Sequence, residues 1–242
     1  MGGSCGERGT VKARALLLCA LVTVTLPACA SLVQQRPDDP DPPVAMRQAP
    51  MDRPHVTLSM PDVTDMLSPN HNSRQGTPIS AIVLHHTASN SSALAIAKYF
   101  QRRDARVSSH YVVDRDGSVV RCVPDALRAW HAGPSSFDGV ANVNDFSIGI
   151  EICNSGDGVE PYPEAQVAAV TRLVACLAKQ YQIPVDRVTR HRDVALPHGT
   201  KIDPSDNFDF TGVVVSASGM LAGDQVTATT AVGSARNASS VR

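Results

Sequence analysis

Residues 145–153 read DFSIGIEIC and carry the clearest strand pattern in the chain. Apolar side chains at every second position alternate with Ser147, Gly149 and Glu151. Because successive side chains of a strand point to opposite faces, this period of two predicts a β-strand with one wholly apolar face. Glu151 then lies on the other face beside two small residues, which leaves room next to its carboxylate.

Strand and helix patterns alternate on both sides of this stretch, from about residue 79 to residue 210. Strands are predicted at residues 79–84, 110–114, 118–123 and 185–191, and helices at residues 91–103 and 163–181. The two middle strands flank an Arg-Asp-Gly turn and so predict a β-hairpin. The first helix has a serine at its start as a cap, and Pro163 suits the first turn of the second. The alternation predicts the α/β class, as a single domain with a central mixed β-sheet flanked by helices.

The composition excludes several classes of protein. The chain has 242 residues, of which 43% are hydrophobic and 19% charged, and its formal net charge is −1. The length suits one domain with tails, and the apolar fraction suffices for a core, which excludes a wholly disordered chain. A net charge near zero gives no general attraction for nucleic acid. No apolar run reaches the roughly 20 residues that span a bilayer, and no glycine-rich phosphate loop follows the first strand, so neither a polytopic membrane protein nor a nucleotide-binding protein is expected.

The N-terminus has the layout of an export signal. A lysine and an arginine precede an apolar stretch at residues 15–26, which as a helix covers about 18 Å and is too short to span a membrane. Two cleavage sites remain open. The sequence Ala-Cys-Ala at residues 28–30 suits ordinary signal peptidase, whereas Leu-Pro-Ala-Cys at residues 26–29 resembles a lipobox in which Cys29 becomes acylated. The proline- and aspartate-rich stretch that follows favours lipidation, since it suits a tether behind a lipid anchor.

Three candidate metal ligands stand at strand ends or in a following loop. His85 ends the first predicted strand, His191 ends the last, and Asp203 lies twelve residues later. A hydrolytic zinc site needs about three protein ligands, commonly histidine and carboxylate, with one position left for water. Spacing alone is weak support, because a histidine beside a strand is more often structural. His86 is not expected to bind the same metal, since adjacent side chains of a strand point to opposite faces.

Five segments carry a resemblance to a known family. They are VLHHTA at 83–88, SHYVVDRDG at 109–117, AWHAG at 129–133, NDFSIGIE at 144–151, and TRHRD at 189–193 followed by KIDP at 201–204. In this order they resemble the type 2 N-acetylmuramoyl-L-alanine amidases, zinc enzymes related to the peptidoglycan recognition proteins and to the phage amidase-type lysozyme. Together with the export signal and the lipobox, the resemblance is closest to bacterial outer-membrane lipoprotein amidases that face the periplasm.

The resemblance implies a role for five residues. It implies a zinc site formed by His85, His191 and Asp203. It also implies Glu151 as the catalytic carboxylate and Lys201 as the catalytic lysine. The alternative for Glu151 is a solvated glutamate at a strand end, and the alternative for Lys201 is a solvated lysine in a loop.

Further residues near these segments are candidates for substrate binding. His131 and Trp130 belong to the AWHAG segment, which borders the groove in relatives, although Trp130 could also pack against the core. Asn154 closely follows Glu151 and is a candidate for a hydrogen bond to the peptide. Ser109 stands where some phage and animal relatives have a tyrosine that assists catalysis, and this departure favours Glu151 as the general base.

The predicted domain layout has four parts. They are a signal peptide at 1–28, a tether at 29–61, the catalytic domain at 62–212 and a low-complexity tail at 213–242. The tail has almost no charge and is expected to be disordered. Three of the six cysteines, Cys122, Cys153 and Cys176, lie in the domain. They are either small buried hydrophobic side chains or one disulfide with one cysteine left over.

The sequence therefore predicts an exported, monomeric zinc amidase. It would hydrolyse the amide between the lactyl group of N-acetylmuramic acid and L-Ala of the peptidoglycan stem peptide. Its partners would be peptidoglycan or muropeptides, and the membrane only through the lipid anchor. One alternative is a non-catalytic peptidoglycan-binding module, although relatives that only bind generally lack a zinc ligand. The other is a cytoplasmic recycling amidase acting on anhydromuropeptides, which the export signal opposes unless translation starts at Met46 or Met51.

Overall fold

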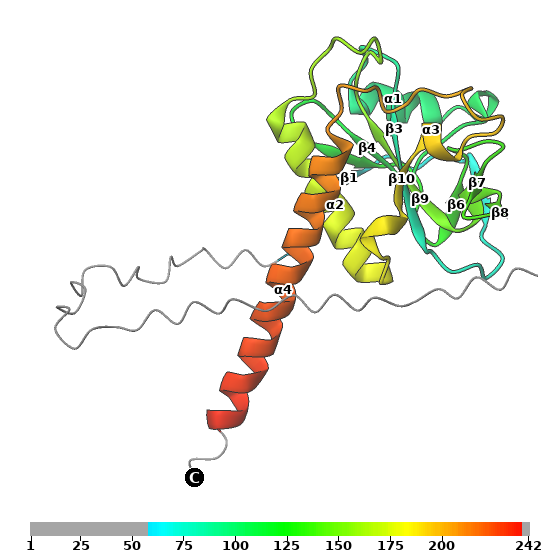
Figure 1. The fold of residues 1–242 in the computed structure, drawn as a ribbon. Coiled ribbons are helices and arrows are strands. Elements are labelled where there is room, and N and C mark those ends of the chain that lie inside the picture. Colours follow the sequence, from blue (N-terminus) through cyan, green and yellow to red (C-terminus); the bar gives the residue numbers. More distant parts are fainter. Residues whose placement is uncertain (1–57, 239–242) are drawn as a thin grey trace, which may run out of the picture. The chain divides into compact units, whose positions relative to one another are not determined.

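The strand predicted at residues 145–153 is β9 (Ser147–Ile152), inside a six-stranded sheet of order β1-β5-β4-β9-β3-β10 (Figure 1). The computed structural model describes residues 58–238, with side chains through residue 224. The other five strands are β1 (Val63–Asp65), β3 (Ala81–His86), β4 (Tyr111–Val113), β5 (Val119–Arg121) and β10 (Val188–Arg190). Two small sheets pair β2 (His71–Ser73) with β6 (Leu127–Ala129) and β7 (Ser136–Phe137) with β8 (Val140–Ala141). The predicted export signal, Cys29 and most of the predicted tether lie outside the described residues.

Parallel and antiparallel pairs are combined in the sheet. Strands β4, β9, β3 and β10 each run parallel to the next, whereas β5 runs antiparallel to β4 and parallel to β1. The prediction of a mixed sheet is therefore confirmed, and so is the β4–β5 hairpin. Because β9, β3 and β10 are parallel, their carboxyl ends meet at one edge of the sheet.

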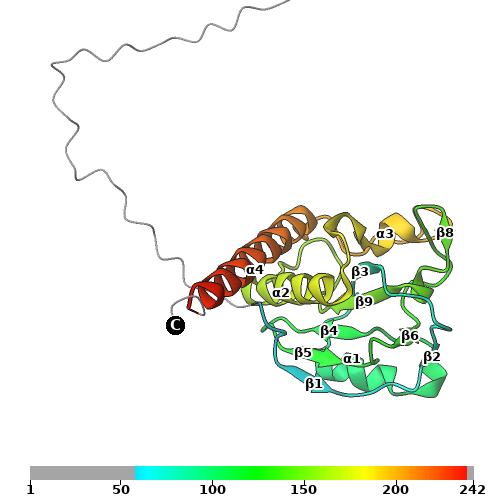
Figure 2. The same ribbon diagram turned by 90° about the horizontal axis from the view of Figure 1, so that it is seen from below.

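One face of the sheet is covered by two helices that lie side by side, α2 (Glu164–Tyr181) and α4 (Phe210–Ala238) (Figure 2). The apolar face of β9 points toward α2. Ile148 and Ile150 are in one fully buried cluster with Leu173 and Leu177 of the helix. Burying such a side chain contributes about 1.5–3 kcal/mol relative to leaving it exposed. The prediction that Ile148 and Ile150 lie on the apolar face of the strand is therefore confirmed.

The opposite face is covered in part by α1 (Ala93–Phe100). The helix begins one residue later than predicted: its cap is Ser92 and not Ser91, and Ser92 Oγ accepts a hydrogen bond from the N–H of Ala95 at 3.3 Å. Phe100 packs in a buried cluster that includes Cys122 and Cys153. These two cysteines and Cys176 are free and buried. The interpretation of the cysteines as small buried side chains is confirmed.

The tail predicted to be disordered after residue 212 is helical through residue 238. Asp209 Oδ1 accepts the N–H of Gly212 at 2.8 Å, which caps the start of α4. Val213 and Ala217 are buried in the cluster formed with α2, with Phe210 and Leu221 packed against it. These four residues are spaced so that they lie on one face of the helix. The residues between them are mostly small and uncharged, so the sequence shows no clear contrast between an apolar and a polar face. None of the helices within residues 58–238 is long and apolar enough to cross a membrane.

Other boundaries also differ from the sequence prediction, and the helix predicted to reach residue 103 ends at Phe100. The strand predicted at residues 185–191 is a 3₁₀ turn (Val185–Arg187), then β10, and then α3 (His191–Val194). His191 thus opens a short helix instead of ending a strand. Pro163 is the residue before α2 and not part of its first turn. It has no N–H to donate, and its backbone is still extended there.

The turn of the β4–β5 hairpin packs tightly against the start of α2 at Gly117. This residue has φ +85°, and a Cβ would lie 2.7 Å from the carbonyl oxygen of Ala165. We expect Gly117→Ala to lower the free energy of unfolding by about 1–3 kcal/mol, through the left-handed backbone and the clash together. Gly76→Ala is the matched control, since Gly76 has φ +82° but nothing within 4 Å of its added Cβ. Urea unfolding of both variants separates the two effects, and equal losses would show that the clash has no cost.

Candidate active site

The parallel strands bring three of the predicted residues to one edge of the sheet. His85 on β3 is the register partner of Glu151 on β9, so the two stand beside each other near the ends of their strands. β10 pairs with β3 on the other side, and His191 follows β10 directly. The carboxyl edge of a parallel sheet is where ligands commonly bind in open α/β folds.

Asp203 joins the two histidines from the loop after α3. Its Oδ2 lies 3.2 Å from His85 Nδ1 and 2.9 Å from His191 Nδ1. The three potential ligand atoms lie within 4.8 Å of one another, and the residues are 1%, 5% and 9% exposed. Two imidazole nitrogens and a carboxylate oxygen, converging and largely withdrawn from water, fit a metal such as zinc. The prediction that these residues come together is thus met by their positions.

The electrostatics of the site keep His85 ready to act as a ligand. Burial lowers the pKa of His85 to about 4, although its hydrogen bond to Asp203 acts in the opposite direction. A histidine must be neutral to bind a metal. Burial also acts to raise the pKa of Asp203, but the hydrogen bonds to His191 and His85 outweigh it and hold that pKa far below its usual range.

The loop that carries Asp203 is fixed at both ends. The N–H of Arg192 donates to the carbonyl of Asp203 at 3.0 Å, and Arg192 Nε donates to the carbonyl of Ile202 at 3.0 Å. On the other side, the N–H of Ser205 donates to His86 Nδ1 at 3.2 Å. His86 therefore stays outside the ligand group, as expected, and instead holds the loop in place.

Glu151 has one carboxylate oxygen that is buried without a hydrogen-bond partner among the described residues. Its side chain is half-buried, and this oxygen is Oε2. Burial, together with repulsion from Asp203, raises its pKa well above the usual range, and Lys201 opposes this shift. A carboxyl group with a raised pKa holds a transferred proton more readily than an ordinary one, which suits general acid–base catalysis.

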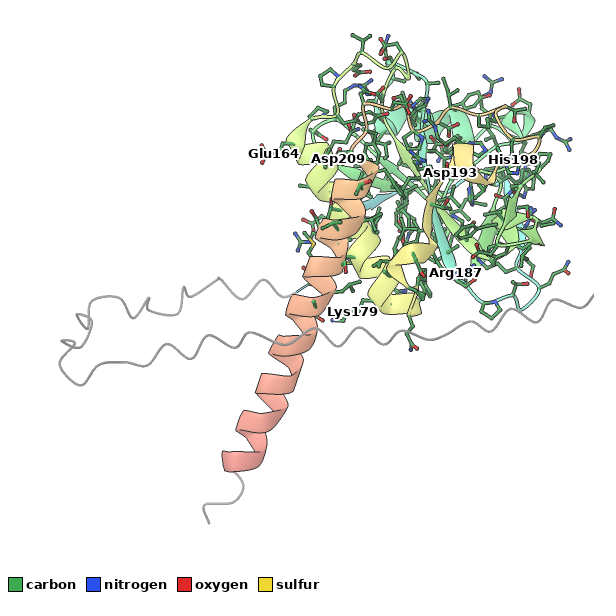
Figure 3. All side chains as sticks on the ribbon, viewed as in Figure 1. Glu164, Lys179, Arg187, Asp193, His198 and Asp209 are labelled. Carbon is green, nitrogen blue, oxygen red and sulfur yellow. The ribbon has the colours of Figure 1, made fainter. Side chains whose placement is uncertain are left out.

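Lys201 lies at the rim of a cleft that opens beside the ligand group. The cleft is lined by Lys201, Thr200, His191, Trp130 and Arg106, among others. Lys201 is exposed, so its ammonium group is available to a bound molecule. Figure 3 shows His198 in the loop before Lys201 and Asp193 on α3, in the same part of the molecule.

Trp130 is placed where a ligand could touch it. Its ring is half-buried, and its Nε1 donates to Asn72 Oδ1 at 2.9 Å. A second hollow, lined partly by Asn72, Arg106 and Arg128, adjoins the cleft along Trp130. Of the three residues predicted to bind substrate, Trp130 and His131 both line the cleft.

The side chains of His131 and Asn154 are both largely buried. His131 is 6% exposed, and its ring nitrogens face His85 Nε2 at 3.0 Å and Ser147 Oγ at 3.3 Å. Asn154 is fully buried; its amide donates to the carbonyl of Glu160 at 3.1 Å and accepts the N–H of Gly156 at 2.9 Å. His131 also lines the cleft beside the ligand group, so its contact with a substrate stays a prediction, whereas Asn154 has no exposed surface for a substrate.

The room predicted beside Glu151 is also filled by His131. A Cβ at Gly149 would lie 2.5 Å from Cγ of the imidazole, so the glycine is required by the close approach of this ring. Burial, and next the neighbouring His85, hold the pKa of His131 well below its usual value.

Sequence reasoning assigned no role to Asn144 and Arg74. Asn144 Oδ1 accepts the N–H groups of His131 at 3.2 Å and Ala132 at 2.9 Å, and so fixes that segment. Arg74 is buried and donates to backbone carbonyls, including that of Ser147 at 2.8 Å. Asn144 could have been identified from the sequence, because it stands at the start of the segment that contains β9. Arg74 could not, because it lies outside every segment that resembles the family.

Comparisons with known proteins agree with this geometry. A family model described as N-acetylmuramoyl-L-alanine amidase matches residues 75–206. The 1,6-anhydro-N-acetylmuramyl-L-alanine amidase AmpD of Haemophilus influenzae is 39% identical over 106 residues, which are 43% of this chain and 55% of that protein. The N-acetylmuramoyl-L-alanine amidase AmiD of Escherichia coli is 35% identical over 132 residues, 48% of this chain and 46% of that protein. The chain spans about half the length of these curated relatives.

Solved structures resemble the fold as well. A crystal structure of an AmpD derivative has a TM-score of 0.55 and 27% identity, covering 65% of this chain and 96% of that one. A complex of E. coli AmiD with anhydro-N-acetylmuramic acid-L-Ala-D-γ-Glu-L-Lys has a TM-score of 0.51 and 30% identity, covering 60% of each chain.

Proposed function

The chain belongs to the N-acetylmuramoyl-L-alanine amidase family, whose model matches residues 75–206 of its 242, and we propose that it is a zinc-dependent amidase. Its reaction would be hydrolysis of the amide between the lactyl group of N-acetylmuramic acid and L-Ala of the stem peptide. One observation carries the proposal. Two histidine nitrogens and the Asp203 carboxylate converge beside Glu151, whose buried oxygen has no partner among the described residues.

The residues would share the chemistry as follows. His85, His191 and Asp203 would hold the zinc, which would supply Lewis-acid chemistry and make a water molecule more acidic. Glu151 would accept the proton of the attacking water and later return it to the leaving nitrogen. The ammonium group of Lys201 would stabilise the negative charge that develops on the carbonyl oxygen.

The overall reaction is the hydrolysis of one amide bond by one water molecule. The water oxygen forms a bond to the lactyl carbonyl carbon, and the bond from that carbon to the nitrogen of L-Ala breaks. The proton that Glu151 took from water ends on that nitrogen. The products are the lactyl carboxylic acid and a peptide with a free L-Ala amino group.

The relatives support a soluble muropeptide as one substrate. AmpD is named for 1,6-anhydro-N-acetylmuramyl-L-alanine, and the AmiD complex contains an anhydro-N-acetylmuramic acid tripeptide. The half-buried Trp130 and the arginines at the cleft provide an apolar surface and positive charge for a sugar and an acidic peptide. We propose anhydromuropeptides and intact peptidoglycan as the two substrate forms to compare.

The setting of the enzyme is a separate part of the proposal. The lipobox ending at Cys29 supports an exported lipoprotein at the outer membrane, facing the periplasm, and the chain would act as a monomer. Mass spectrometry of the N-terminal peptide from a bacterial membrane fraction tests this. A diacylglyceryl group on Cys29 is expected, and an unmodified N-terminus after residue 30 would contradict it.

Product analysis tests which bond is cut. The purified chain is incubated with sacculi and with soluble muropeptides, and the products are sequenced by mass spectrometry. Peptides that begin with L-Ala, together with intact muramic acid, are expected. Cleavage within the stem peptide or the glycan chain contradicts the proposal, and binding without any cleavage indicates a non-catalytic binding module.

Lys201 provides a test of the charge-stabilising role. We expect Lys201→Ala to lower kcat about 10²–10³-fold, because a lost oxyanion donor has this effect in related chemistry. Zinc content should be unchanged, since Lys201 is not among the ligands. Lys98→Ala, at an exposed lysine of α1, is the matched control. Steady-state kinetics and metal analysis of both variants check this, and an undiminished kcat in Lys201→Ala removes the residue from the mechanism.

A further inference from the structure

Four polar residues at every second position of one short segment are called here the brace. They are Ser68, Asn70, Asn72 and Arg74, and the segment includes the strand β2. Alternate residues of an extended chain point the same way. Each brace side chain forms hydrogen bonds to residues 30 or more positions away along the chain. All four precede residue 75, where the match to the family model begins.

Asn72 holds the ring of Trp130. The indole has a single N–H, and it donates to Asn72 Oδ1 at 2.9 Å. Arg128 Nη1 donates to the same oxygen at 3.3 Å. Because an indole and a guanidinium can only donate, the oxygen of the Asn72 amide must face them both. The amide is therefore held in one orientation, and it holds the indole in turn.

The backbone of Trp130 is connected to the brace as well. Its N–H donates to Ser108 Oγ at 3.0 Å, and its carbonyl accepts the N–H of Ser108 at 3.1 Å. The Ser108 hydroxyl donates in turn to the carbonyl of Asn70. Both the backbone and the ring of Trp130 thus depend on this one segment.

Asn70 holds the loop that carries Arg106. Its amide nitrogen lies 2.9, 2.8 and 3.2 Å from the carbonyl oxygens of Phe100, Arg102 and Val107. Asn70 is 2% exposed, so these carbonyls are its substitutes for water. Arg106 lies between two of them, is exposed, and lines the cleft together with Trp130. Arg106 and Trp130 are called here the substrate wall.

Arg74 fixes the brace to the sheet. Its Nη2 donates to the carbonyl of Ser147, the first residue of β9, at 2.8 Å, and its Nε donates to the carbonyl of Asp125 at 2.8 Å. The residue is 6% exposed, and a buried charge needs such partners. Arg74 is therefore an anchor and not a group that is free for a ligand.

We propose that the brace positions the substrate wall, with Asn72 acting through Trp130 and Asn70 acting through Arg106. Neither asparagine is a catalytic residue. The inference rests on the proposed function, in which Trp130 and the cleft arginines contact the muropeptide. Among the described residues, no hydrogen bond joins the brace to His85, His191 or Asp203. Changes in the brace should therefore affect substrate binding and leave zinc binding unaltered.

The fluorescence of Trp130 is the first test, because it is the single tryptophan of the chain. The full chain is stripped of metal, which prevents turnover, and titrated with a soluble anhydromuropeptide. A change in the emission of the unaltered chain is expected, and it gives the dissociation constant. Asn72→Leu should bind about 2–10-fold more weakly, the effect of one lost hydrogen bond. Its indole should also be quenched more readily by acrylamide before the muropeptide is added.

Two further variants make this comparison specific. Asn72→Asp keeps an acceptor oxygen for the indole N–H and should restore the quenching and most of the affinity. Ser73→Ala is the matched control, since Ser73 belongs to the same strand but its Oγ accepts only within its own segment, from the N–H of Gln75 at 3.0 Å. The proposal is overturned by unchanged emission of the unaltered chain, by unchanged affinity in Asn72→Leu, or by no recovery in Asn72→Asp.

Kinetics and zinc affinity of the zinc-loaded variants are the second test. Asn72→Leu should raise KM by about the same 2–10-fold, with kcat and zinc affinity unchanged, because it weakens binding and not the chemical step. A parallel loss of zinc affinity would indicate general damage to the fold and would overturn the proposal. If the zinc-loaded, unaltered chain cleaves no muropeptide, the proposed function fails, while the fluorescence titration still decides the role of the brace.

Asn70→Ala tests the other half of the brace. It removes the donor to three carbonyls of the Arg106 loop and should weaken muropeptide binding, again without loss of zinc. A folded Asn70→Ala chain with unchanged muropeptide affinity would overturn the part of the proposal that concerns Arg106. Because Asn70 is buried, this variant can fail to fold, and the exposed Asn72 then decides the proposal by itself.

Discussion

Asp203→Ala is expected to leave the chain without bound zinc and without amidase activity. The carboxylate is the ligand that faces both histidines, at 3.2 and 2.9 Å from their Nδ1 atoms. Its removal leaves two neutral ligands, and a catalytic zinc site generally needs three from the protein. The loss of affinity should exceed the roughly 10–100-fold effect of changing a residue behind a ligand.

Metal analysis after dialysis and a chelator competition measure this effect. The matched control is Asp193→Ala, which removes an exposed carboxylate of the neighbouring α3 that pairs with Arg190. A surface ion pair of this kind is worth about 0–1 kcal/mol, so the control should fold and bind zinc normally. One zinc per chain and a full rate in Asp203→Ala would show that the ligand assignment is wrong.

Glu151→Gln is expected to lower kcat by about 10²–10⁴-fold while zinc stays bound. The amide has nearly the same shape as the carboxyl group but cannot accept the proton of water. Folding should be preserved, because the amide has nearly the size of the carboxyl group and brings no charge into the site.

Steady-state kinetics with a soluble muropeptide, together with metal analysis, check this result. Glu164→Gln is the control, since Glu164 stands exposed at the start of α2, away from the cleft (Figure 3). A rate within a few-fold of the unaltered chain would assign the proton transfer to another group. Loss of zinc in Glu151→Gln would indicate that Glu151 is a ligand.

The parts of the fold that depend on local periodicity could be predicted from the sequence. The alternation around Ile148 and Ile150 identified the strand and its core face, and the helix predicted at residues 163–181 is α2. The parallel arrangement then brings His85 and Glu151 together, which a sequence pattern cannot show by itself.

The parts that depend on packing between distant segments could not be predicted. His131 was expected in the groove and does line the cleft, but its ring also lies against Gly149 and contacts His85, which is 46 residues away. Asn154 was expected to face the peptide, but its amide is used within its own loop. In both cases the residue type indicated a polar contact correctly, and only the three-dimensional structure identified the partner.

Helix α4 shows the same limit for secondary structure. Its low-charge sequence of small residues gave no strong helical face, so a disordered tail was expected. The stabilising contacts come from Val213 and Ala217 against α2, and such tertiary packing commonly outweighs local propensity.

The most direct test of the account is reconstitution of activity with zinc. The purified chain is stripped with a chelator, dialysed, and incubated with muropeptides before and after addition of one equivalent of zinc. No peptide release is expected from the stripped chain, and peptides beginning with L-Ala are expected once zinc is bound. Full release from a chain shown to contain no metal would contradict the account, and so would a zinc-loaded chain that binds muropeptides but releases nothing.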